Sequence, residues 1–175
     1  MRKHSSVLFA VVLFAATSFT TFAGETKVLV SNVHICCKNC VDGITKALAD
    51  VKGVKADVSK EKGTVALTAE STESAQAAVD ALAGAGYHGT TDSKDVMMKD
   101  NSGAPAGKVA KLEVSGIHNC CGKCNTAIEK AVKAVAGVKE TTAKAKVTTF
   151  EVTGDFDAKA VVKALNDAGF HAMVK

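Results

Sequence analysis

The chain has 175 residues and a formal net charge of +4, with 47% hydrophobic, 23% charged and 5% aromatic residues and no Trp. This is the composition of an ordinary soluble protein. The lysines are scattered among Asp and Glu rather than gathered into a basic stripe, so we expect no nucleic-acid partner.

The first 23 residues differ in character from the rest. A basic start, Met1–His4, precedes an apolar run, Val7–Ala16, and small residues lead to Ala23. This order is typical of a secretory signal peptide, and the apolar run is short for a membrane span. We therefore predict a signal peptide over residues 1–23 and a periplasmic or secreted mature protein, with an uncleaved anchor as the alternative.

The remaining sequence repeats itself. VSNVHICCKNC at Val30–Cys40 matches VSGIHNCCGKC at Val114–Cys124 with an offset of 84 residues, and Ala81–His88 matches Ala164–His171 with an offset of 83. A match that extends over nearly all of both halves indicates two homologous domains.

The domain boundaries follow from this repeat. We place the first domain at residues 24–92 and the second at 108–175, and we expect a monomer. Between them, residues 93–107 contain Pro105, which is the only proline, together with Gly, Ser, Asn and Asp. Such a composition predicts a flexible linker.

Each repeat shows the order strand, helix, strand, strand, helix, strand. Strands are indicated by alternating apolar and polar residues, and helices by apolar residues at helical spacing. In the first repeat the predicted elements are a strand over Lys27–Val33, a helix from Cys40 that stops by Gly53, strands over Val54–Ser59 and Thr64–Ala69, an Ala-rich helix capped by Thr72 or Ser74 and ending at Gly86, and a short strand from Tyr87. In the second repeat Gly137 and Gly169 stop the helices, Asp155 or Asp157 caps the second one, and Phe170 begins the last strand. This order predicts an α+β fold of two ferredoxin-like sandwiches, each with a four-stranded antiparallel sheet and two helices on one face.

All six cysteines lie in two short segments at the start of the first helix of each repeat. A helix N-terminus carries partial positive charge, which stabilises a thiolate and lowers the pKa of a cysteine. Cys-x-x-Cys offers two sulfurs to one ion, and sulfur ligands select thiophilic ions such as Cu(I) or Zn(II). The sequence therefore predicts a metal site in each repeat.

Disulfides are the alternative for these cysteines. An exported protein meets an oxidising compartment, and six is an even number. Pairing within a repeat, however, leaves one of its three thiols free, which favours metal binding.

At these residues the chain resembles tandem heavy-metal-associated domains, a family that includes copper chaperones, modules of copper-exporting P-type ATPases and a periplasmic mercury-binding protein. The family pattern is an alternating strand, Gly-Met-x-Cys-x-x-Cys and a helix similar to VDGITKAL at Val41–Leu48. The resemblance implies thiophilic ions, Cu(I), Zn(II) or Hg(II), with about one per domain. It also implies an aromatic residue beneath each metal loop, at Tyr87 and Phe170. The metal-binding pairs that it implies are Cys37 with Cys40 and Cys121 with Cys124.

The chain departs from the family pattern in its metal loops. Val33 and Ile117 stand in place of the Met, Asn32 replaces the Gly in the first repeat, and each loop is longer by two residues. The added residues bring an extra cysteine and a histidine, which could extend the site to three or four ligands and would favour tetrahedral Zn(II). These additional candidate ligands are Cys36, Cys120, His34 and His118.

We thus expect a non-enzymatic exported protein that sequesters soft metal ions or passes them to a membrane metal transporter. A thiol–disulfide redox protein is the first alternative, because Cys-x-x-Cys at a helix start also occurs there. The thioredoxin family would require a proline facing the motif, and neither repeat contains one. A module with purely structural disulfides is the second alternative.

Overall fold

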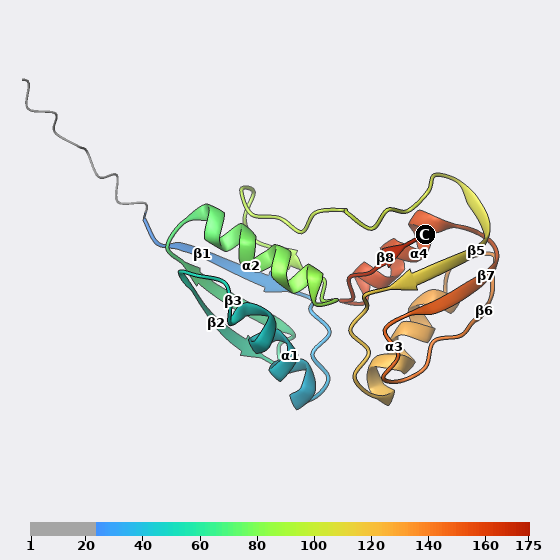
Figure 1. Ribbon diagram of the computed structural model, residues 1–175, viewed down its shortest axis with the longest axis horizontal. Helices are drawn as coiled ribbons and strands as arrows, with labels where there is room; N and C mark the ends of the chain where they lie inside the picture. The colour runs from blue at the N-terminus through green and yellow to red at the C-terminus, as the bar shows by residue number, and fades with distance from the viewer. Residues whose placement is uncertain (1–23) are drawn as a thin grey trace, which may run out of the picture.

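The computed structural model describes residues 24–175, so the predicted signal peptide lies outside the described residues. Over these residues the chain forms an α+β structure with two four-stranded antiparallel sheets and four helices, arranged as two halves side by side (Figure 1). The first sheet has the strand order β2-β3-β1-β4, and the second has β6-β7-β5-β8. Each outer strand β4 and β8 therefore pairs with the first strand of its own half.

The element order is the same in the two halves. The first contains β1 (Thr26–Ser31), α1 (Lys38–Leu48), β2 (Val54–Ser59), β3 (Thr64–Ala69), α2 (Thr72–Gly84) and β4 (Thr90–Thr91). The second contains β5 (Lys108–Ser115), α3 (Gly122–Lys133), β6 (Val138–Thr141), β7 (Phe150–Asp157), α4 (Ala158–Asp167) and β8 (Met173–Val174).

The core of each half lies between its sheet and its helices. Val28 and Val30 alternate inward from β1, and Leu112 and Val114 do so from β5, as their spacing predicted. Burying these side chains removes apolar surface from water, which stabilises the folded state by roughly 25 cal/mol for each Å² buried. From α1 the buried residues are Cys40, Ile44 and Leu48, so the same stripe that fills the core carries a cysteine.

The caps of the second helices differ partly from the prediction. Ser71, rather than Thr72 or Ser74, is the N-cap of α2. Its hydroxyl accepts from the N–H of Ser74 at the N3 position, and the Ser74 hydroxyl accepts from the N–H of Ser71, which makes a capping box. This arrangement satisfies two backbone N–H groups reciprocally. In the second half Asp157 is the N-cap of α4 and accepts from the N–H of Ala160, as one of the two predicted caps.

The two halves meet through the segments that follow α2 and α4. Tyr87 and Phe170 form an antiparallel bridge, and the exchange of hydrogen bonds around it is symmetrical. The carbonyl of Gly86 accepts from the N–H groups of His118 and His171, and the carbonyl of Gly169 accepts from those of His34 and His88. Each half thus holds in place the cysteine-containing loop that precedes the first helix of the other half.

The segment between the halves is packed against both of them. Gln76 of α2 donates to the carbonyl of Met97 and accepts from its N–H, Val96 is fully buried, and the carbonyl of Ser102 accepts from Val174 of β8. The predicted linker is therefore held at both ends, because its apolar and backbone groups find partners on α2 and β8. Within residues 24–175, no helix combines the length and the apolar character needed to cross a membrane.

Candidate metal centre

The cysteines occupy equivalent places at the start of α1 and α3. Cys37 and Cys121 are the N-cap residues, with extended backbone, and neither first turn contains an acidic residue. One turn further on, Cys40 and Cys124 are fully buried. The positive ends of both helices therefore face the sulfurs without a competing carboxylate.

The six sulfurs of the two halves lie together in one cluster. Across the interface, Cys36 Sγ is 3.6 Å from Cys121 Sγ and 3.5 Å from Cys124 Sγ. The two buried sulfurs, of Cys40 and Cys124, are 3.9 Å apart. The two cysteine loops converge because backbone hydrogen bonds to the carbonyls of Gly86 and Gly169 hold each loop against the opposite half.

The cluster has approximate twofold symmetry. Exchanging each cysteine with its partner in the other repeat reproduces the same neighbours at similar distances. The Cys36–Cys121 distance of 3.6 Å has its counterpart in Cys37–Cys120 at 3.7 Å, and the Cys36–Cys40 distance of 3.7 Å in Cys120–Cys124 at 3.7 Å. All six cysteines are free thiols.

The histidines of the metal loops stack on the aromatic residue of the other half. His34 lies 4.4 Å from Phe170 between ring centroids, and His118 lies 4.4 Å from Tyr87. The Tyr87 hydroxyl donates to the Cys40 carbonyl at 3.0 Å and lies 3.1 Å from Nε2 of His118. The expected aromatic residue beneath the loop is thus present, and it also contacts the histidine of the opposite half.

The electrostatics of the cluster divide the thiols into two kinds. The backbone N–H of Cys124 lowers the pKa of Cys121 to about 6, and burial raises the pKa of Cys36 to about 12. The hydrogen bond from the Cys124 thiol lowers the pKa of Cys40 and, in return, raises that of Cys124. Burial also raises the pKa of Cys120. The cluster therefore combines thiolates, which bind metal directly, with thiols that must release a proton first.

Several groups of side chains could hold an ion. In each group the candidate ligand atoms lie within 4.8 Å of one another. A metal–sulfur bond of about 2.3 Å places sulfurs about 3.8 Å apart in a tetrahedral site and about 4.0 Å apart in a trigonal one. The groups are Cys40, His118, Cys120 and Cys124; His34, Cys36 and Cys124; and Cys36, Cys37 and Cys121.

The predicted site residues are thus brought together, although not as two separate sites. All eight candidates lie in or beside the cluster, and each of the three groups draws ligands from both repeats. The four-ligand set expected within the first repeat, of His34 with Cys36, Cys37 and Cys40, is not one of the groups found among the described residues. His34 instead groups with Cys36 of its own repeat and with Cys124 of the other.

Two features of the site were not anticipated from the sequence. Asn119 is buried and donates to the carbonyls of Lys144 and Val147, so it fastens the second metal loop to the segment before β7. The corresponding Ile35 packs into the core instead. His88 and His171 stack with their ring centroids 5.8 Å apart, and His171 is buried where the two halves meet.

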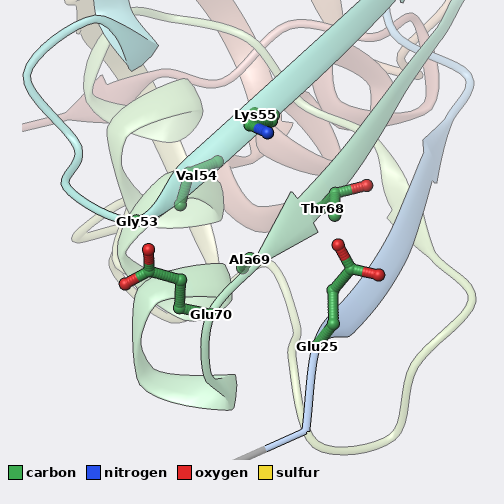
Figure 2. A pocket seen from close by; sticks show the side chains of 7 residues that line it. All are labelled: Glu25, Gly53, Val54, Lys55, Thr68, Ala69 and Glu70. Carbon is green, nitrogen blue, oxygen red and sulfur yellow. The ribbon is translucent and has the colours of Figure 1, made fainter.

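A surface hollow lies far from these sulfurs. Residues at the start of β1, the start of β2 and the end of β3 line it, among them Glu25, Lys55 and Glu70 (Figure 2). The cysteine loop follows the opposite end of β1. The hollow is therefore separate from the metal centre.

Comparison with known proteins agrees with the chemistry of the cluster. Residues 111–171 match the heavy-metal-associated domain. Copper-transporting ATPase 2 of Rhizobium meliloti (strain 1021) is 29% identical over 140 residues, which make up 77% of this chain and 14% of that protein. The chain thus spans a small part of the length of this relative.

Two solved structures are also similar. Oxidized MerP from Ralstonia metallidurans CH34 is 26% identical over 37% of this chain and 94% of its own, with a TM-score of 0.35. The N-terminal soluble domains of Bacillus subtilis CopA are 19% identical over 87% of this chain and 95% of theirs, with a TM-score of 0.34. The family match therefore covers most of the second repeat, including the cysteines at the start of α3.

Proposed function

We propose that the protein is an exported, non-enzymatic protein that binds Cu(I) on cysteine thiolates, and that both halves are ferredoxin-like heavy-metal-associated units. The observation that carries this proposal is the convergence of six free thiols on the N-terminal ends of α1 and α3. A set of ligands made mostly of sulfur favours soft ions over Ca²⁺ or Mg²⁺. Zn(II) and Hg(II) are the competing ions, and the group of three sulfurs with His118 favours Zn(II) among them.

The test is a Cu(I) titration of the fully reduced protein under anaerobic conditions, against a chelator that changes colour when it loses the ion. We expect the protein to withdraw Cu(I) from the chelator, and a variant with Cys37, Cys40, Cys121 and Cys124 all changed to Ser to lose this capacity. Equal binding by the variant would contradict the assignment of these residues. A parallel Zn(II) titration ranks the two ions.

Export is supported by the basic start and apolar run of residues 1–23. Expression of the full-length sequence in a bacterium with a periplasm should yield a protein that begins at Gly24 and is released by osmotic shock. A product that keeps residues 1–23 and stays with the membrane fraction would instead indicate an anchor.

The biological role is sequestration of the ion or its transfer to a membrane metal transporter. Similarity to part of a copper-transporting ATPase supports a transporter as the partner. A redox role is the second candidate, favoured by the sulfurs that lie within 4.0 Å of one another. Catalysed reduction of insulin disulfides at thioredoxin-like rates would favour that role over metal binding.

A further inference from the structure

We propose that the two halves share one cluster of four Cu(I) ions on the six thiolates, and that this cluster holds the halves together. The inference rests on the proposed function, because it names the number and arrangement of the ions at the same site. It differs from the expectation of about one ion for each domain.

The sulfur positions contain four triangles whose edges are 3.5–4.0 Å long. A trigonal ion with metal–sulfur bonds of about 2.3 Å needs sulfurs about 4.0 Å apart, so each triangle has nearly the right size for one ion. Neighbouring triangles share an edge, which places their centres about 2.3 Å apart, so the sulfurs must spread further for all four ions to bind together. The triangles are Cys36, Cys40 and Cys124; Cys36, Cys121 and Cys124; Cys37, Cys40 and Cys120; and Cys40, Cys120 and Cys124.

Every triangle takes sulfurs from both halves. Within the first half, Cys40 neighbours both Cys36 and Cys37, but the latter two sulfurs are not neighbours of each other. No triangle therefore forms inside one repeat, and three-sulfur coordination requires the halves to be closed. The buried sulfurs of Cys40 and Cys124 belong to most of the triangles, so they form the centre of the cluster.

Charge also favours several ions. When six thiols bind four Cu(I) ions, six protons leave, and the cluster carries a net charge of −2. Anionic sulfurs beside the fully buried Cys40 and Cys124 would be costly without such compensation. Each helix N-terminus adds roughly half a positive charge, and neither α1 nor α3 has an acidic residue in its first turn.

The extra cysteine of each repeat is what makes the triangles possible. Without Cys36 and Cys120, the remaining neighbours are the pairs Cys37–Cys40, Cys121–Cys124 and Cys40–Cys124, and no triangle is left. The residues that lengthen the metal loops therefore convert two Cys-x-x-Cys pairs into one shared cluster.

The test compares the unchanged protein with the double variant Cys36→Ser/Cys120→Ser, which keeps both Cys-x-x-Cys pairs. Reduced protein is titrated with Cu(I) from a chelator, the ions per chain are counted by native mass spectrometry, and X-ray absorption gives the sulfurs around each ion. We expect the unchanged chain to pass from no ions to four with few intermediates and three sulfurs on each ion. The double variant should bind two ions, one after the other, with two sulfurs each.

Two ions bound independently by both proteins would overturn the shared cluster and leave the proposed function intact. Four ions bound by both would also overturn it, because the variant lacks the triangles. No binding by either protein would overturn the proposed function itself. If the double variant does not fold, the single variants Cys36→Ser and Cys120→Ser each keep two triangles, and both should bind fewer ions than the unchanged chain, to the same extent.

Discussion

At the scale of single residues, one hydroxyl group distinguishes the two halves of the metal centre. Tyr87 donates to the Cys40 carbonyl and lies beside His118, whereas Phe170 offers nothing to His34, whose buried Nε2 has no hydrogen-bond partner among the described residues. The rings themselves stack in nearly the same way, with interplanar angles of 26° and 29°.

We therefore expect opposite effects from two matched substitutions. Tyr87→Phe removes a buried hydrogen bond and should lower the free energy of unfolding by about 1 kcal/mol. Phe170→Tyr supplies a partner to His34 and should raise it by a similar amount. Urea unfolding of the reduced, metal-free proteins measures both, and destabilisation by Phe170→Tyr would show that the ring of the second half has no room for the hydroxyl.

The stacked pair of His88 and His171 makes stability depend on pH. Burial lowers the pKa of His88 to about 4, with a further lowering by His171, and burial also lowers that of His171, while Asp100 and Asp167 act in the opposite direction on His88. Below a pH of about 6.5 the unfolded chain binds protons that the folded chain does not, so stability is lost as the pH falls from about 6.5 toward about 4.

The measurement is the melting temperature of the metal-free protein at pH 7.5 and at pH 5. We expect the unchanged protein to melt a few degrees lower at pH 5, and His88→Gln/His171→Gln to reduce this difference. An equal loss in both proteins would assign the pH dependence to other groups, such as His34, whose pKa burial also lowers.

At the scale of elements, the ends of α2 and α4 serve two purposes. Gly86 and Gly169 follow the helices with positive φ, and the N–H of Tyr87 and of Phe170 bonds back to the last turn, as in a Schellman motif. The same glycines also touch the opposite half, since a Cβ on Gly86 would lie 2.3 Å from the backbone N of His118.

Gly86→Ala should therefore lower the free energy of unfolding by more than the strain of an alanine at positive φ explains. Gly107 has a similar φ, +86° against +83°, but a Cβ there meets nothing within 4 Å, so Gly107→Ala is the matched control. We expect Gly107→Ala to cost about 1 kcal/mol, and Gly86→Ala to cost more and to reduce the number of Cu(I) ions bound. Equal effects on stability and on binding would show that the halves do not depend on this contact.

The loop before α3 depends on a single amide side chain. Asn119→Ala would leave the carbonyls of Lys144 and Val147 without this donor, at a cost of about 1–3 kcal/mol. The corresponding change Ile35→Ala removes apolar packing instead, at a cost of about 2–5 kcal/mol. Chemical unfolding of both variants measures how much each side chain stabilises its metal loop. A decrease in the free energy of unfolding well under 1 kcal/mol for Asn119→Ala would show that Asn119 does not stabilise the loop before α3.

The strands and helices could be predicted from the sequence because the spacing of apolar residues within each segment determines them. The alternation of Val28 and Val30, and the helical spacing of Ile44 and Leu48, predicted the strand and the helix that the structure contains. The position of Cys40 in the first helical turn followed from the same reasoning. The N-cap of α2 was displaced by one residue, since several serines and threonines near Ser71 could serve equally well.

At the scale of the whole molecule, the joining of the two cysteine loops could not be predicted from sequence. It depends on contacts between residues that are far apart in the sequence, such as the hydrogen bond from the N–H of His118 to the carbonyl of Gly86. Gly86 gave no sign of this contact, because a glycine there is already explained by the end of a helix. For the same reason, the burial of His171 where it stacks on His88 of the other half could not be predicted.

A protease site inserted between Ala106 and Gly107, where both residues are exposed, would test whether bound metal holds the halves together. After cleavage, we expect the Cu(I)-loaded halves to elute together in size-exclusion chromatography at low concentration, and to separate once a strong Cu(I) chelator is added. Halves that separate in the presence of Cu(I) would show that the ions do not join them.

The segment over residues 93–107, held at Gln76 on one side and at Val174 on the other, joins the halves covalently. A tether of this length gives each half an effective concentration of its partner in the millimolar range. Two separate chains that associated through such loops would dissociate in dilute solution. In this protein the association of the two halves does not depend on the protein concentration, because they belong to one chain.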